Sequence, residues 1–348
     1  MQKFDLLVFI GRFQPVHRGH LAVIHAGLDA ASRLLILTGS ARRPRSVRDP
    51  FSAAEREAMI HACLAPDQLA RVQVRPLDDA MYNDSVWIRN VHAQVDAAVA
   101  EAFPGRPVNE LRIGLVGHSK DSSSYYLNLF PGWDSVNVPN ARGISATDLR
   151  LAYFGKGLAA AEPVLRERVP APVLELLAQF SSTQTYAQLA EEQDFVSRYR
   201  SQFSGLKYPV QFNTADAVVI QSGHILLVRR GARPGLGQLA LPGGFIRTNE
   251  TAQDAAIREL REETRLKVPE PVLRGSISDH ETFDDPYRST RGRTFTTAFR
   301  LDLRPTAGLP KVKGADDAKD AFWQPLARVT PEEMFEDHYY IIQKMVGI

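Results

Sequence analysis

Cysteine is the scarcest residue of this 348-residue chain, and Cys63 is its one example. A single thiol excludes an intrachain disulfide and fits a reducing compartment. Apolar runs of the roughly 20 residues needed to span a bilayer are also absent. Neither charge sign dominates, because 42 Lys and Arg against 40 Asp and Glu leave a net charge of +2. We therefore expect a cytoplasmic protein with no membrane segment, and the even charge balance argues against a nucleic-acid partner.

Length and composition indicate two globular domains. The chain is longer than one core usually serves, and its 44% hydrophobic and 24% charged residues are typical of soluble proteins. In the first half, apolar runs alternate with helical patterns, which predicts an α/β domain with a doubly wound, Rossmann-like parallel sheet. The expected strands are residues 6–10, 34–38, 72–75 and 111–116, and the expected helices are residues 20–31, 53–65 and 85–100.

The second half has a different pattern, which predicts an α+β domain. Apolar strands at residues 217–220 and 224–229 flank a Gln-Ser-Gly turn, a hairpin signal. A further strand is expected at 294–303 and a closing helix at 331–345. Between the halves lies a helical region in which Pro163 is expected to act as an early break. The predicted domains are residues 1–183 and 207–348, joined by a helical connection at 184–206.

A glycine-rich, basic motif follows the first expected strand. Gly11 and Gly19 allow a ligand to approach the backbone closely, and the next helix offers amide groups and a positive dipole to an anion. His17 and His20 are three residues apart and can both donate to phosphoryl oxygens. Arg12 adds a forked cation suited to phosphate. The segment therefore predicts a phosphate-binding site, although a histidine pair alone is more often a surface feature.

A second segment, residues 143–150, supports this interpretation. Ser145 and Thr147 can cap a helix, and alone they would indicate an ordinary N-cap. Together with Arg150 and the first motif, they resemble the H-x-G-H and I-S-x-T-x-x-R signatures of the nucleotidyltransferase superfamily. Residues 11–20, 50–56, 82–87 and 117–121 further resemble archaeal-type nicotinamide-mononucleotide adenylyltransferases.

That resemblance implies adenylyl transfer from ATP to nicotinamide mononucleotide. His17, His20 and Arg150 are then the expected catalytic residues. Trp87 is expected to stack on the nicotinamide ring, with core packing as the alternative, and Asn83 to read its carboxamide. The remaining substrate contacts expected in this half are Gly11, Arg12, Phe13, Arg48 of a basic loop, Gly117, Lys120, Asp121, Ser145 and Thr147.

The third informative segment joins a glycine turn to an acidic helix. Glu259, Glu262 and Glu263 stand at i, i+3 and i+4, so a helix gathers their carboxylates, which repel unless a cation such as Mg²⁺ lies among them. A solvated acidic helix is the alternative, but it leaves Gly244 unexplained. Residues 244–266 resemble the Nudix box, G-x5-E-x7-R-E-U-x-E-E-x-G-U, where U is apolar. Arg265 replaces the last glycine, which puts the helix exit in doubt.

The Nudix resemblance implies metal-dependent hydrolysis of a nucleoside diphosphate derivative on a Nudix sandwich. Gly244, Glu259, Glu262 and Glu263 are the expected metal residues, for Mg²⁺ or alternatively Mn²⁺, and the three acids are also the expected catalytic residues. Arg258 can pair with Glu262 at i+4 and bind substrate with Gly244. The later residues Arg288 and Arg291 suit a second phosphate or a ribose, with a plain charged loop as the alternative.

Both halves together resemble bifunctional adenylyltransferase–Nudix proteins. The usual substrate of the Nudix half of those proteins is ADP-ribose. The implied partners are ATP, nicotinamide mononucleotide and ADP-ribose, and a homo-oligomer is compatible with the sequence. Two alternatives stay open. One is a Nudix domain that senses ADP-ribose or cleaves another nucleoside diphosphate derivative, although a sensor need not keep three acids. The other is a cytidylyl- or pantetheine-phosphate-type transferase, against which residues 82–87 argue.

Two substitutions test whether the predicted sites are independent. We expect Glu262→Gln to abolish ADP-ribose hydrolysis and spare adenylyl transfer, because it removes a metal-binding carboxylate from one domain. We expect His20→Ala to do the reverse, because it removes a hydrogen-bond donor to phosphate from the other domain. Both activities are measured on each purified variant, and loss of both from either change would contradict two autonomous centres.

Overall fold

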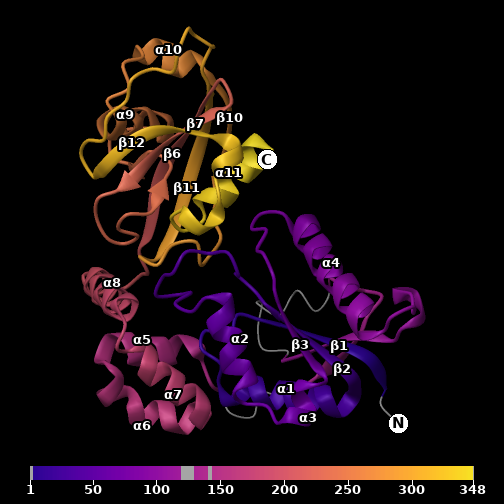
Figure 1. Cartoon of the computed structure of the whole chain (residues 1–348). Coiled ribbons are helices and arrows are strands. Elements are labelled where there is room, and N and C mark those ends of the chain that lie inside the picture. Colours follow the sequence, from indigo (N-terminus) through magenta and orange to yellow (C-terminus); the bar gives the residue numbers. More distant parts are fainter. Residues whose placement is uncertain (1–2, 119–128, 140–142, 348) are drawn as a thin grey trace. The chain divides into compact units, whose positions relative to one another are not determined.

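The chain divides into two units, Met1–Gln193 and Asp194–Ile348, each with its own sheet. The computed structural model describes residues 3–118, 129–139 and 143–347 (Figure 1). The division falls inside helix α8 (Gln184–Ser201), which lies within the connection expected at 184–206. Among the described residues, no helix is long and apolar enough to cross a membrane.

Five parallel strands form the sheet of the first unit. Their order is β3-β2-β1-β4-β5, so the chain reverses its direction of progress between β1 and β4. In such sheets ligands bind beyond the carboxyl ends of the strands, at this switch point. The bounds are β1 Phe4–Gly11, β2 Ala31–Thr38, β3 Val72–Pro76, β4 Ile113–Gly117 and β5 Asp134–Asn137. The four expected strands are present, and β5 was not expected.

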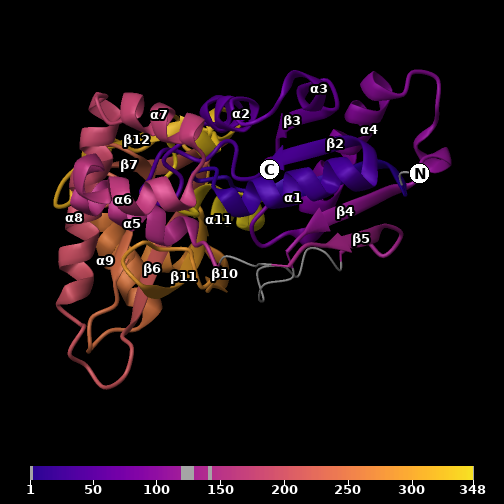
Figure 2. The same ribbon diagram turned by 90° about the horizontal axis from the view of Figure 1, so that it is seen from below.

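Helices cover both faces of this sheet, which confirms the doubly wound architecture. Along β1, Leu7 and Phe9 pack on one face against α1 (Arg18–Ala30), and Leu6 and Val8 pack on the other against α4 (Asp84–Ala102). Figure 2 shows α1 lying along its face of the sheet. The alternation follows from the two-residue period of a strand, which sends successive side chains to opposite faces.

Two expected helices differ from the observed ones. The helix expected at 53–65 ends earlier, as α2 (Ala53–His61), because Pro66 forces Ala65 into an extended conformation before the short helix α3 (Pro66–Leu69). Pro163 does not break the chain but lies inside α6 (Leu158–Arg168), where the buried Ala161 and Leu165 hold the helix against the core. The other helices of this unit are η1 Val108–Glu110, α5 Ala146–Lys156 and α7 Ala171–Phe180.

The second unit contains a mixed sheet with the order β10-β11-β6-β7-β12. Strand β6 pairs parallel with β11, whereas its other pairings are antiparallel. The expected hairpin joins β6 to β7 through Ser222 and Gly223, both with positive φ, as a two-residue turn of this type requires. The bounds are β6 Gln211–Gln221, β7 His224–Arg230, β8 Leu239–Ala240, β9 Gly243–Phe245, β10 Ile277–Phe283, β11 Arg293–Asp302 and β12 Ala318–Pro325.

Helix α9 (Ala252–Thr264) carries the acidic motif and packs on this sheet. Its buried residues Ala256 and Leu260 share a hydrophobic core with Ala215 and Ala217 of β6, and Thr251 caps its first turn. The remaining helices are α10 Glu270–Gly275, η3 Leu326–Arg328, η4 Pro331–Glu333 and α11 His338–Val346.

The closing helix predicted at 331–345 is wrong over its first seven residues. A short 3-10 turn comes first, and α11 begins only at His338. Glu336 has a φ of 46°, which a helix cannot accommodate, and the side chain of Asp337 is drawn into a buried ion pair with Arg288. A long-range contact therefore overrides the local helical pattern.

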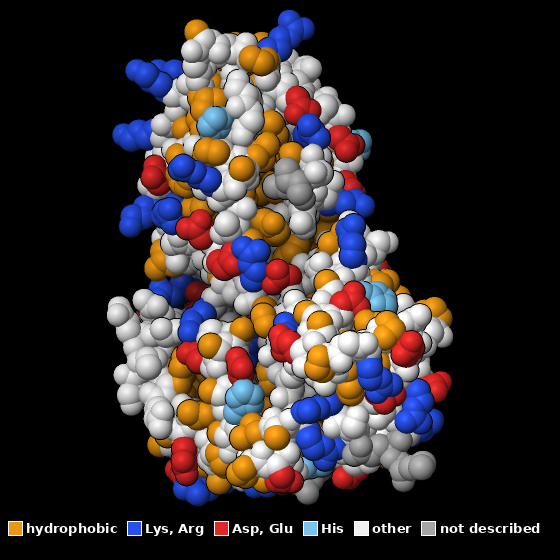
Figure 3. All heavy atoms as spheres, turned by 45° about the vertical axis from the view of Figure 1, so that its right-hand side comes forward, with side chains coloured by type: hydrophobic (Ala, Val, Ile, Leu, Met, Phe, Trp, Pro, Cys, Tyr) orange, Lys and Arg blue, Asp and Glu red, His pale blue; other side chains and the backbone are white. Residues whose placement is uncertain are grey.

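The charged surface and the single cysteine both agree with the sequence-based expectations. On the face shown in Figure 3, basic and acidic side chains of the described residues are interspersed over each unit. Cys63 is half-buried against the core of the first unit, and burial raises the pKa of its thiol to about 11. The expected packed thiol is thus confirmed, and it stays protonated at neutral pH.

Arg265 ends α9 in the left-handed conformation, with φ of 51° and ψ of 25°. A side chain there costs about 1 kcal/mol that glycine avoids. We expect Arg265→Gly to raise the free energy of unfolding of the second unit by about 0.5–1 kcal/mol. Thermal or urea unfolding measures the change. Lys267→Gly, at an exposed position without positive φ, should be destabilising, and a loss of stability in both variants would contradict the explanation.

Candidate functional site

The first site is built at the carboxyl end of β1, where the chain passes through Gly11 into α1. His17 caps the helix, since its Nδ1 accepts from the backbone N–H of His20 at 3.3 Å. In return, Nδ1 of His20 accepts from the backbone N–H of His17 at 3.3 Å. The two rings are stacked with centroids 3.7 Å apart, so both expected histidines lie together.

These reciprocal bonds fix how the imidazoles can act. Because each Nδ1 accepts a hydrogen bond, the proton of a neutral ring resides on Nε2. Gly19 makes room for this arrangement, since a Cβ there would lie 3.0 Å from the His17 ring. The pair therefore offers two N–H donors at the start of a helix, an arrangement suited to phosphoryl oxygens.

Phe13 supports the histidine pair. Its side chain is 1% exposed and packs against the rings of Phe9 and His20, at centroid distances of 5.2 and 4.7 Å. The Phe13 ring therefore holds the second histidine in place, and the expected substrate contact of Phe13 stays a prediction. Its backbone has a positive φ of 52°, which helps to aim the side chain inward.

Arg150 is also held more firmly than the sequence indicated. Its Nε donates to the carbonyl of Val47 at 3.0 Å, Nη1 to that of Gln14 at 2.7 Å and Nη2 to Oγ1 of Thr147 at 3.2 Å. Three of its five N–H groups are thereby used. Burial lowers its pKa to about 10, so it remains charged at neutral pH while it joins three segments distant in the chain.

Arg56 belongs to the same site, although no sequence pattern pointed to it individually. It is 0% exposed, and Nη1 donates to the carbonyl of Arg12 at 2.8 Å and to that of Gly39 at 2.6 Å. Burial lowers its pKa to about 10. Its only sequence signal was its place in the segment 50–56, because its acceptors are backbone atoms that no side-chain pattern reveals.

The remaining residues expected in the first site have varied surroundings. Asn83 caps α4 through Oδ1, which accepts from the N–H of Val86 at 3.2 Å, and Trp87 is half-buried against Phe130 at a centroid distance of 6.0 Å. Ser145 caps α5, Gly117 ends β4 beside β1, and Arg48 is half-buried. Lys120 and Asp121 lie outside the described residues.

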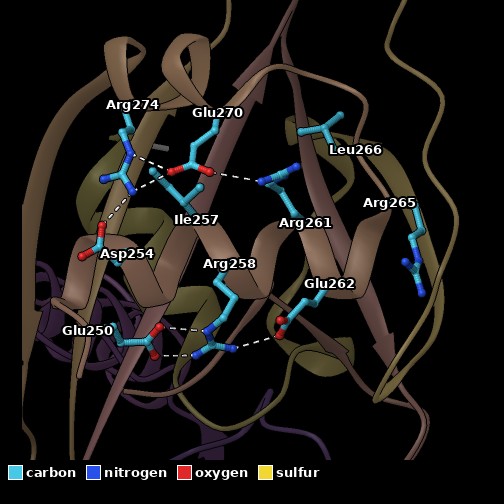
Figure 4. A pocket seen from close by; sticks show the side chains of 10 residues that line it. All are labelled: Glu250, Asp254, Ile257, Arg258, Arg261, Glu262, Arg265, Leu266, Glu270 and Arg274. Atoms are coloured by element: carbon cyan, nitrogen blue, oxygen red, sulfur yellow. Dashed lines mark hydrogen bonds and ion pairs between the residues drawn. The ribbon is translucent and has the colours of Figure 1, made fainter. Parts of the chain in front are cut away.

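The second site centres on Arg258, which lies between carboxylates on the exposed side of α9. It donates to Glu250 at 2.6 Å, to Glu259 at 2.6 Å and to Glu262 at 2.9 Å. Figure 4 shows Arg258 between Glu250 and Glu262. The expected i+4 pair is therefore confirmed, and hydrogen bonds from Arg258 lower the pKa of Glu250 to about 2.

Glu259 and Glu263 point toward the glycine turn. The carboxylate of Glu259 lies where a side chain on Gly244 would be, since a Cβ there would stand 2.5 Å from its Oε1. Glu263 accepts from the N–H of Gly243 at 3.1 Å. Burial raises the pKa of Glu263 to about 8, and the neighbouring charges of Glu259 and Asp216 act in the same direction.

The donor set fits a divalent cation, with one correction. Glu259, Glu262 and Glu263 lie within an arc of about 100° on the helix, and burial, together with the neighbouring acids, raises the pKa of Glu263, which favours a cation nearby. Among the described residues, however, no three acids or histidines are already spaced as a complete metal-binding set. Arg258 draws Glu259 and Glu262 to itself, so the expected platform is not preassembled.

A groove of about 580 Å³ lies on the outer side of α9. It is lined by Glu250, Arg258 and Glu262 and by charged residues of α9 and α10 (Figure 4). Glu259 and Glu263 are not part of its lining. Its charges largely satisfy one another, as those of Arg274, Asp254 and Glu270 do.

Arg288 was expected to bind substrate, and the structure contradicts this. Its side chain is 3% exposed and makes two hydrogen bonds of 2.9 Å to Asp337, which is fully buried. A buried, bidentate pair of this kind fixes the chain between β10 and β11 to the start of α11. The sequence showed a cluster of arginines but not the distant acid that neutralises one of them.

Arg291 and the unexpected Arg230 remain as cations near the acids. The Arg291 guanidinium lies over the ring of Phe245 at 5.2 Å, and its Nε is buried without a hydrogen-bond partner among the described residues. Arg230 lies over Phe335 at 4.1 Å. Burial lowers the pKa of Arg230, and so does the charge of Arg291, whereas Glu263 opposes this change. The two guanidinium groups and the acid are therefore neighbours.

We expect Gly244→Ala to weaken divalent-metal binding and to lower hydrolysis by about 100-fold, since displacement of a reacting group by about 1 Å can cost that much. The new Cβ would push the Glu259 carboxylate aside, a movement that a flexible side chain makes at little cost in stability. Mn²⁺ titration and steady-state kinetics measure the effects. Gly275→Ala, where a Cβ meets nothing within 4 Å, is the matched control, and normal metal binding in Gly244→Ala would contradict the placement.

Comparison with known proteins assigns each unit to a family. Residues 8–151 match the cytidylyltransferase-like family model, and residues 211–345 match the NUDIX domain model. A nicotinamide/nicotinic acid mononucleotide adenylyltransferase of Acinetobacter baylyi is 36% identical over 206 residues, which are 59% of this chain and 98% of that protein. An ADP-ribose pyrophosphatase of Methanocaldococcus jannaschii is 35% identical over 128 residues, 37% of this chain and 69% of that protein.

Among solved structures, the following one resembles the chain over nearly its whole length. It is a bifunctional NMN adenylyltransferase/ADP ribose pyrophosphatase from Francisella tularensis, complexed with AMP and a Mn ion. The TM-score is 0.88 and the sequence identity 32%, and the match covers 99% of both chains. The chain described here therefore belongs to the family of bifunctional nicotinamide-mononucleotide adenylyltransferases and ADP-ribose pyrophosphatases, which join a cytidylyltransferase-like domain to a Nudix domain.

Proposed function

We propose that this chain is a bifunctional enzyme of NAD metabolism. Its first unit transfers an adenylyl group from ATP to nicotinamide mononucleotide, and its second unit hydrolyses ADP-ribose to AMP and ribose 5-phosphate. The observation that carries the proposal is the opposite charge of the two sites, with arginines beside stacked histidines in one unit and clustered glutamates in the other. The names of the relatives and their coverage of the chain support it.

In adenylyl transfer, a 5′-phosphate oxygen of the mononucleotide attacks the α-phosphorus of ATP, and the bond to the β-phosphate breaks as pyrophosphate leaves. No protein nucleophile is needed, so the residues act by alignment and charge stabilisation. His17 and His20 donate from Nε2 to phosphate oxygens. Arg12, Arg48 and the remaining N–H groups of Arg150 balance the charge of the triphosphate.

The other residues of this unit bind the two nucleotides. Gly11 and Gly117 end adjacent parallel strands and allow close approach at the switch point of the sheet. Ser145 and Thr147 lie at the start of α5, whose amide groups suit an anion. Trp87 stacks on the nicotinamide ring, and the side-chain amide of Asn83 binds its carboxamide. Substrate contacts of Lys120 and Asp121 are proposed from the family resemblance alone.

In hydrolysis, water attacks one phosphorus of the diphosphate, and the bridging oxygen leaves with the other phosphate. Glu259, Glu262 and Glu263, with the Gly244 turn beside them, would hold Mg²⁺, which supplies charge stabilisation and lowers the pKa of water when bound. Arg258 orients the acids until the cation arrives. Arg230 and Arg291, two close guanidinium groups beside Glu263, bind the phosphate oxygens of ADP-ribose.

Two assays on the purified protein test the proposal. With Mg²⁺ and ADP-ribose, we expect AMP and ribose 5-phosphate; binding without AMP formation would instead indicate a sensor domain. With ATP and nicotinamide or nicotinate mononucleotide, we expect the dinucleotide and pyrophosphate. Cytidine triphosphate with a sugar or alcohol phosphate, and ATP with phosphopantetheine, are the control pairs. Reaction with only a control pair would overturn the nicotinamide assignment.

A further inference from the structure

A buried carboxylate, Asp49, lies at the centre of the arginines of the first site. It is 5% exposed and follows the basic loop that contains Arg48. Desolvation by itself would raise the pKa of Asp49, but the charges of Arg12, Arg43, Arg48 and Arg150 outweigh it and lower the pKa below its usual range. The side chain is therefore a full negative charge that several guanidinium groups share, although no motif in the sequence singled it out.

The guanidinium groups around Asp49 differ in what holds them. Arg150 and Arg56 are fixed mainly by backbone carbonyls, and Arg43 pairs with Asp79 at 2.7 Å. These three have strong acceptors other than Asp49. Removal of the Asp49 carboxylate would leave those contacts in place.

Arg12 is different, because its one ion pair among the described residues is with Asp49. The Nη1 of Arg12 and the Oδ1 of Asp49 are 3.7 Å apart, too far for a hydrogen bond. Both atoms are buried, and neither has a hydrogen-bond partner among the described residues. The Arg12 side chain as a whole is 39% exposed, so part of it is accessible to a ligand.

This geometry makes Asp49 the group that decides where the Arg12 fork points. Arg56 donates to the backbone carbonyl of Arg12 and so fixes the Arg12 backbone. The orientation of the Arg12 guanidinium then depends on its side-chain rotamers. An arginine side chain loses about 2 kcal/mol of rotamer entropy when it is ordered, and a charge that orders it in advance spares the ligand that cost.

We propose that Asp49 is a positioning residue for adenylyl transfer: its carboxylate orients Arg12 so that the guanidinium meets the triphosphate. The inference rests on the proposed function of the first unit. It assigns no contact between Asp49 and substrate, since a carboxylate would repel the phosphates. Its consequence is that loss of Asp49 weakens the grip on ATP through Arg12 and leaves the mononucleotide site unaffected.

The test uses the full-length protein and a double-mutant cycle of Asp49→Asn and Arg12→Ala. For Asp49→Asn, we expect the KM for ATP to rise roughly tenfold, the effect of one charge-assisted hydrogen bond, with the KM for nicotinamide mononucleotide unchanged. In the Arg12→Ala background, the additional change Asp49→Asn should have less than a twofold effect. Asp78→Asn, which removes a carboxylate from an exposed 3.9 Å pair with Arg42, is the matched control and should behave as wild type.

Three results would overturn the inference: an unchanged KM for ATP in Asp49→Asn, effects of the two changes that multiply fully, or equal losses for both substrates as expected of a merely structural role. If Asp49→Asn does not fold, Asp49→Glu keeps the charge but shifts it by one methylene; the KM for ATP should still rise, and an unchanged value contradicts the inference. Absence of adenylyl transfer in the wild-type protein would instead refute the proposed function itself.

Discussion

The burial of like charges close together, partly out of water, is the constraint on which both sites of this chain depend. In the first unit, Arg12, Arg150 and Arg56 converge on the carboxyl end of the parallel sheet, and burial lowers the pKa of two of them. In the second, burial raises the pKa of Glu259 and Glu263. Charges of one sign in such places favour a ligand of the opposite sign. Polyphosphate satisfies the first set and a divalent cation the second.

The fold supplies provisional partners for these charges. Backbone carbonyls accept from Arg150 and Arg56, and Asp49 faces Arg12. In the second unit, Arg258 plays the corresponding part between Glu259 and Glu262. The arginines of the first unit and the glutamates of the second are therefore ordered, but their charges are only partly neutralised. This explains why glycines stand where they do, since Gly19 and Gly244 leave room for a histidine ring and a carboxylate.

Much of the architecture followed from local sequence, because apolar runs and helical periods are local properties. The four longer strands of the first sheet and the hairpin at Ser222 and Gly223 were predicted on that basis. Strand β5 was not, since its residues are polar and mostly exposed, and its pairing with β4 is what makes it a strand. The late start of α11 depends on Arg288, 49 residues away from Asp337 along the chain. The motifs placed His17, His20 and the glutamates correctly in two groups. They could not reveal the partners of Arg150, which are 103 and 136 residues distant, or the burial of Asp49.

The most direct test of the two charged sites is a crystal structure of the full-length protein with a non-hydrolysable ATP analogue and Mn²⁺, with the metal located by anomalous scattering. We expect triphosphate oxygens within hydrogen-bond distance of Arg12, His17 and His20. We also expect a Mn²⁺ peak bound by Glu259 and Glu263, with Glu259 released from Arg258. A triphosphate bound elsewhere, or a metal peak remote from these glutamates, would contradict these expectations.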